Sequence, residues 1–81
     1  MLNIETTTRL SPEEAIKSAV EFFGPEGYGM EVASRDKCCA EFQGGGGGVT
    51  VTVISRDKGA TVSLISREWD YQVRDFIDKI K

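Results

Sequence analysis

The 81-residue chain contains no histidine. Histidine is the side chain best suited to proton transfer near neutral pH, and it is the commonest metal ligand. The cysteines, Cys38 and Cys39, are adjacent, and no second pair completes a four-ligand zinc site. No recognisable set of catalytic side chains stands elsewhere in the sequence. We therefore expect a protein that is not an enzyme and that carries no cofactor and no metal.

The sequence also lacks a long apolar run and a cluster of basic residues. No run approaches the ~18 residues of a membrane span, and residues 1–9 show neither the basic nor the apolar region of a signal peptide. Lysine and arginine are scattered, and the net charge is −3, so no basic stripe is available for a phosphate backbone. We expect a cytoplasmic protein that binds neither nucleic acid nor a membrane.

The composition that remains is that of a small globular domain. Hydrophobic residues make up 40% and charged residues 28% of the chain, which is typical of folded proteins. The length fits one domain, residues 1–81. On folding, so short a chain buries only about 60% of the surface that its unfolded form exposes. Most apolar side chains are therefore needed for the core.

Hydrophobic periodicity predicts two helices. Ser11 is the expected N-cap of the first, Pro12 suits its first turn, and Gly24 ends it. An apolar stripe that starts at Trp69 and recurs after 4, 7, 8 and 11 residues predicts the second. Ser66 is its expected N-cap.

Alternating apolar and polar residues predict five strands. They cover residues 2–8, 28–35, 38–43, 49–56 and 60–67. A run of five glycines, Gly44 to Gly48, separates two of them. It lacks the lysine and the following helix of a phosphate-binding loop, so we interpret it as a mobile hairpin loop that would act as a lid if a pocket lies nearby.

These elements predict an α+β fold in the order β-α-β-β-β-β-α, with a five-stranded antiparallel sheet and both helices on one face. The chain looks like a small bacterial domain, and its element order resembles the TBP-like fold and, more loosely, a shortened helix-grip (START or Bet v1-like) domain. The resemblance implies either DNA binding on the open sheet face or an apolar ligand held between the sheet and the last helix. The expected outward side chains are acidic or neutral, which argues against DNA: Glu31, Glu41, Thr50, Thr52, Thr61 and Ser63.

The function we favour is a non-catalytic binding module for a small apolar ligand or a protein partner. The alternative is a structural protein that forms a homodimer through the exposed sheet face, where Ile54 and Ile65 point outward on neighbouring strands. The candidate contacts of either function are Met30, Phe42, Trp69, Tyr71, Ile54 and Ile65.

Cys38 and Cys39 have two interpretations. As neighbours on one strand they would point to opposite faces, and a disulfide between them would depart from ordinary bridge geometry. We interpret them as small apolar residues. The alternative is a pair of reactive thiols, which would leave room for a thiol-based enzyme.

Overall fold

The structure is a computed structural model, and it describes residues 2–80. Five strands and two helices follow one another in the predicted order, β-α-β-β-β-β-α. The elements are β1 (Leu2–Thr8), α1 (Pro12–Phe23), β2 (Glu31–Arg35), β3 (Cys39–Gly44), β4 (Gly47–Arg56), β5 (Gly59–Arg67) and α2 (Asp70–Ile80).

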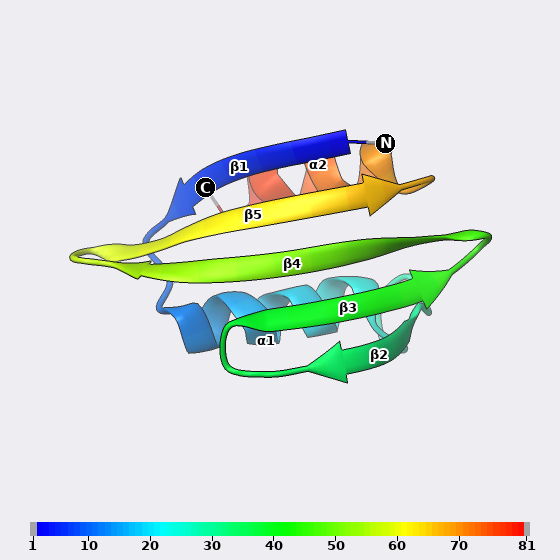
Figure 1. The fold of residues 1–81 in the computed structure, drawn as a ribbon, viewed down its shortest axis with the longest axis horizontal. Coiled ribbons are helices and arrows are strands. Elements are labelled where there is room, and N and C mark those ends of the chain that lie inside the picture. Colours follow the sequence, from blue (N-terminus) through cyan, green and yellow to red (C-terminus); the bar gives the residue numbers. More distant parts are fainter. Residues whose placement is uncertain (1, 81) are drawn as a thin grey trace.

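The strands form one open antiparallel sheet in the order β1-β5-β4-β3-β2. Figure 1 shows both helices behind this sheet, with α1 behind β3 and β4 and α2 behind β5 and β1. The face toward the viewer is not covered by any described element. The predicted antiparallel α+β architecture is therefore confirmed. Neither described helix has the length and apolar character needed to cross a bilayer.

The first helix begins where its capping residues predict. The Ser11 hydroxyl accepts a hydrogen bond from the Glu14 N–H at 3.2 Å and lies 3.0 Å from the Glu14 carboxylate. This pairing satisfies one of the N–H groups that a helix start leaves unpaired.

The chain after α1 folds back on the helix end instead of entering the sheet. The Tyr28 N–H donates to the Phe22 carbonyl, and the Met30 N–H donates to the Phe23 carbonyl. These donors are therefore not free to pair with β3. The expected strand over 28–35 was too long by three residues, because β2 begins at Glu31.

The glycine run forms a tight turn, which corrects the expected five-residue loop. Only Gly45 and Gly46 lie outside the strands, with φ of 57° and 80°. Two successive positive φ angles suit a two-residue hairpin turn, and glycine adopts them without a steric cost. A Cβ at Gly47 would lie 2.0 Å from the Arg67 carbonyl oxygen, so β4 and β5 also need a glycine there.

The expected cap of the second helix was wrong. Ser66 is still part of β5, and its hydroxyl accepts from the Trp69 N–H at 3.2 Å, before α2 starts at Asp70. The chain turns from strand to helix at Glu68, which has a positive φ of 70°. Because this turn intervenes, the Ser66 hydroxyl stabilises the connection between β5 and α2 and does not cap the helix.

Two hydrogen bonds fix α2 at its ends. At its start, the Trp69 indole N–H donates to the Gly44 carbonyl oxygen at 2.9 Å. At its end, the buried Thr8 hydroxyl donates to the Ile80 carbonyl oxygen at 2.6 Å. The helix is thus joined to both β3 and β1, which lie on opposite sides of the central strands.

The core fills the layer between the sheet and the helices. Its largest fully buried side chains come from both layers: Phe23, Phe42, Phe76, Met30, Leu64, Val49, Val51, Val62 and Val73. The Phe23 ring lies 5.5 Å from the Phe42 ring and 5.3 Å from the Phe76 ring, measured between centroids. Within the described chain, every buried side-chain nitrogen and oxygen atom has a hydrogen-bond partner.

Candidate functional site

The structure places the candidate contact residues in three separate regions. Met30 and Phe42 are each only 1% exposed and belong to the core. Trp69 and Tyr71 flank the start of α2, and Ile54 and Ile65 lie on the uncovered face of the sheet. No single cavity therefore collects them.

The space between sheet and helices is occupied by side chains. A ligand held there would have to touch Met30, Phe42 and Phe76, each at most 1% exposed. The interlocking phenylalanine rings already make contacts of the kind such a ligand would need. An apolar ligand would enter only if the core opened.

The uncovered sheet face has an uncharged centre. Three cross-strand pairs of β4 and β5 form it, and the two members of each pair lie on the same face. They are Thr50 with Ile65, Thr52 with Ser63, and Ile54 with Thr61. Each strand presents two hydroxyl side chains in succession and one isoleucine at the end of the row.

Ile54 and Ile65 stand at opposite ends of this centre. Ile65 pairs with Thr50, and Ile54 lies four residues farther along β4. At about 3.3 Å per residue, the two are separated by roughly 13 Å along the strands. The Ile54 side chain is 52% exposed and the Ile65 side chain is 43% exposed. The structure therefore shows two apolar points joined by a row of hydroxyls, where the sequence suggested one apolar spot.

Charged side chains surround the uncharged centre. Glu41 pairs with Thr50 from the β3 side, and Glu5 pairs with Ser63 from the β1 side. Arg56 lies at one end, where its Nε–H donates to the Thr61 hydroxyl at 2.8 Å. The face thus has an uncharged middle between two carboxylates, with the guanidinium groups of Arg56 and Arg67 at its two ends.

A shallow hollow lies on this face beside the β3–β4 turn. Its volume is about 250 Å³, and its lining includes Glu41, Gln43, Gly48, Ile65 and Arg67. Gly48 pairs with both Gln43 and Arg67, so the missing side chain leaves a gap in the row of outward residues.

A second surface region is aromatic and lies at the far end of α1. The Phe22 ring lies 5.2 Å from the Tyr28 ring, and the Tyr28 ring lies 5.9 Å from the Trp69 ring. The Lys79 ammonium group lies over the Phe22 ring, 5.6 Å from its centroid, and borders the aromatic region on that side. Tyr71, which is 75% exposed, is the most exposed large hydrophobic side chain of the described chain.

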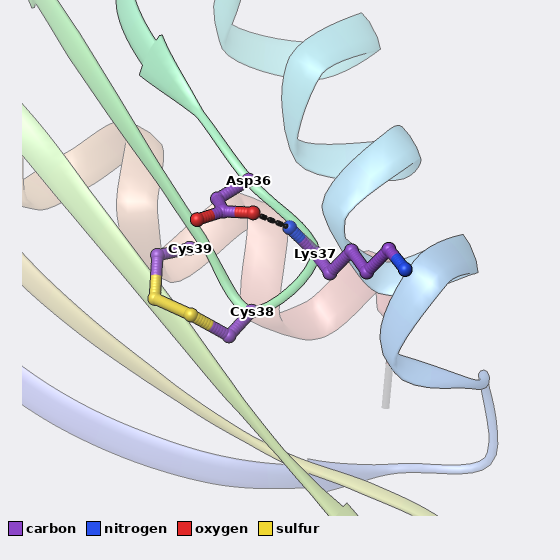
Figure 2. The surroundings of a disulfide bond; sticks show 4 residues. All are labelled: Asp36, Lys37, Cys38 and Cys39. Atoms are coloured by element: carbon purple, nitrogen blue, oxygen red, sulfur yellow. Dashed lines mark hydrogen bonds between the residues drawn. A yellow bond between two sulfur atoms is a disulfide. The ribbon is translucent and has the colours of Figure 1, made fainter.

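Cys38 and Cys39 form a disulfide bond, which corrects the expectation of two free thiols (Figure 2). The expectation assumed that both residues lie on a strand. Cys38 instead belongs to the turn between β2 and β3, and the strand begins only at Cys39. The alternation of side chains therefore does not separate the two sulfur atoms. No sequence signal other than adjacency indicated the bond.

The described residues offer no set of ligands for a metal. Between Leu2 and Ile80, no three histidine, cysteine, aspartate or glutamate side chains gather closely enough to hold an ion.

No known protein-family model matches the sequence, and a search of curated proteins finds no significant match. Among solved structures, the fold is similar to the crystal structure of the protein SSP2350 from Staphylococcus saprophyticus, a structural-genomics target. The TM-score is 0.54 and the sequence identity is 15%, over 95% of this chain and 79% of that one. At this identity the similarity extends to the fold alone.

Proposed function

We propose that the protein is a non-catalytic module that binds a protein partner on the uncovered face of its sheet. The observation that carries this proposal is the distribution of charge on that face. The central pairs of β4 and β5 carry no charge, while Glu5 and Glu41 flank them. Protein interfaces commonly combine a core depleted of charge with a polar rim.

The size of the face supports a protein partner. The molecule measures 36 Å by 20 Å across the plane seen in Figure 1, which encloses about 720 Å². A standard protein interface buries about 800 Å² on each partner. The whole sheet face is thus of the same order of size as one side of such an interface.

The chemistry of the face favours a protein with basic groups opposite Glu5 and Glu41, while Arg56 and Arg67 at the ends of the face suit acidic groups. Glu5 and Glu41 on either side of the centre would repel a phosphate backbone. The filled core disfavours the small apolar ligand, because Met30 and Phe42 present almost no surface. The same repulsion between these carboxylates and phosphate groups disfavours DNA binding of the kind that the TBP-like resemblance implied.

Self-association through the same face is the second candidate function. The exposed Ile54 and Ile65 supply its apolar contacts. A second copy would also bring the same flanking carboxylates and a net charge of −3, and like charges oppose association. A different partner with basic groups avoids this repulsion.

The test compares three forms of the chain in affinity capture from the source cells, with quantitative mass spectrometry. These are the wild type, the double variant Ile54→Lys/Ile65→Lys, and the control variant Tyr71→Lys, which places one new positive charge at an exposed position of α2. We expect a protein captured by the wild type and the control but lost at least tenfold with the double variant. Equal capture by all three forms would overturn the proposal.

Native mass spectrometry of the same three forms separates the two candidate functions. A doubled mass that only the double variant loses would replace the proposal with self-association. A monomeric wild type, together with a captured protein that depends on the face, supports the partner-binding module.

A further inference from the structure

We infer that the Cys38–Cys39 bond is a thiol–disulfide exchange site for a small thiol of the glutathione class, and that its state alters one end of the uncovered sheet face. The inference concerns the chain alone, so it does not depend on the proposed function.

The bond contributes little to holding the fold together. A disulfide stabilises a protein chiefly by closing a loop in the unfolded chain, and the effect grows with loop length. Here the two cysteines are sequence neighbours, so almost no loop is closed. The bond also joins no two elements, because β2 ends at Arg35 and β3 begins at Cys39. Its effect is local.

The backbone around the bond is held by other contacts. The Cys38 carbonyl accepts from the Val53 N–H at 2.7 Å, and the Cys39 carbonyl accepts from the Asp36 N–H at 2.7 Å. The Asp36 carboxylate also accepts from the Lys37 N–H at 2.8 Å (Figure 2). The turn between β2 and β3 therefore keeps its hydrogen bonds when the sulfur atoms separate. Opening the bond frees side chains without dismantling the sheet.

The bond is accessible to a small thiol. Cys38 is exposed and Cys39 is half-buried. Because Cys38 is the more exposed residue of the two, we take its sulfur as the point of attack and the Cys39 sulfur as the leaving group. Attack by thiolate on a disulfide depends on such access.

The exchange balances with two equivalents of the small thiol. A thiolate attacks the Cys38 sulfur, forms a mixed disulfide and releases Cys39 as a thiolate, which takes up a proton. A second small thiolate attacks the mixed disulfide, forms the small disulfide and releases Cys38, which is likewise protonated. The protein disulfide is reduced by two electrons, and two small thiols are oxidised to one disulfide.

The consequence reaches the uncovered face through Cys39. Cys39 pairs with Thr52 on β4 and so belongs to the same outward row as Glu41. While the bond is closed, the Cys38 side chain is tied beside this row. Once the bond opens, Cys38 rotates freely, and the surface next to Thr52 changes its shape and gains two thiol groups.

The first experiment counts thiols on the intact, folded chain. The protein is incubated with reduced glutathione or with oxidised glutathione, alkylated with iodoacetamide under native conditions, and weighed by mass spectrometry. We expect no adduct after oxidised glutathione and two after reduced glutathione, with full reversal. Two adducts under both conditions, or none under both, would overturn the inference.

The second experiment locates the consequence. Amide NMR spectra of the two forms should differ at residues 36–40 and 51–54, and should coincide along α1. The variant Cys39→Ser should collect a mixed disulfide with glutathione several-fold faster than Cys38→Ser, because Cys38 is the accessible sulfur. Identical spectra of the reduced and oxidised wild type would contradict the inference, even if one of the variants failed to fold.

Discussion

The Cys38–Cys39 bond depends on the residue at which β3 begins. With both residues on a strand, the sulfur atoms would lie on opposite faces. With β3 starting at Cys39, Cys38 is part of a turn and the two sulfurs form a bond. The bond is therefore a feature of the turn between β2 and β3 and not of the strand.

We expect the double variant Cys38→Ser/Cys39→Ser to be almost as stable as the wild type. Loop-closure entropy gives about 1 kcal/mol or less for adjacent residues, against about 3 kcal/mol for a 15-residue loop. Urea unfolding of both proteins under oxidising conditions measures the difference. A loss above about 2 kcal/mol would show that the bond holds more than its own turn.

Glu68 has a left-handed backbone conformation that glycine adopts more easily. Its φ of 70° lies in the left-handed region, which costs a non-glycine residue roughly 1 kcal/mol or more. We expect Glu68→Gly to raise the free energy of unfolding by about 1 kcal/mol.

The control for that variant is its neighbour Arg67, which lies in β5. Glycine in a strand costs about 0.5–1 kcal/mol, so Arg67→Gly should be destabilised in the same urea titration. If both variants lost stability equally, the left-handed turn at residue 68 would not be a source of strain.

At the scale of the elements, most of the fold could be predicted. Alternation located all five strands, and the Ser11 cap located the start of α1. The connections were harder. The segment before β2 pairs with the end of α1 through Tyr28 and Met30, and the alternation of apolar and polar residues does not indicate that these N–H groups turn back to the helix.

The candidate site was predicted only in part, because its geometry depends on how two strands pair. Ile54 and Ile65 were correctly placed on the outward face, because alternation decides which face a residue occupies. Their separation along the strands depends on the register between β4 and β5. That register is set by the turn at residues 57–58, and it cannot be read from either strand alone.

The end of α2 depends on one side chain of β1. The Thr8 hydroxyl is buried and donates to the Ile80 carbonyl oxygen at 2.6 Å. We expect Thr8→Val to lower the free energy of unfolding by about 1–2 kcal/mol, because the buried carbonyl loses its donor while the shape is kept.

Thr7→Val is the matched control, because Thr7 is the exposed neighbour on the opposite face of β1. It should leave the unfolding midpoint nearly unchanged. Hydrogen exchange at the last turn of α2 should increase in the Thr8 variant alone. Unchanged exchange there would mean that Thr8 does not hold the helix end.

The whole molecule has little stability to spare. The free energy of unfolding of a domain is about 0.05–0.15 kcal/mol per residue, which gives this chain a total of roughly 4–12 kcal/mol. Phe23 is fully buried and packs against both Phe42 and Phe76. Removing such a ring costs about 3–5 kcal/mol, a large share of the total.

We therefore expect Phe23→Ala to melt at least about 10 °C below the wild type by circular dichroism, because a loss of about 1 kcal/mol shifts the midpoint of a domain this size by about 4–8 °C. Phe22→Ala is the control, because Phe22 is only partly buried and its loss leaves a smaller cavity. A Phe23→Ala protein that melted within a few degrees of the wild type would show that the core can collapse around the missing ring.

The position of β1 in the sheet also has a consequence during protein synthesis. β1 is made early, yet it pairs with β5, and partners such as Thr8 with Ala60 and Leu2 with Ser66 lie 52 and 64 residues apart. At about 5–20 residues per second, β1 waits roughly 3–13 s for that partner. Throughout this interval both of its edges are unpaired, and another nascent chain on the same messenger can occupy them. Slowed translation before residue 59 should therefore raise the yield of aggregated chain, and a permuted gene that starts at β2 should not share that sensitivity.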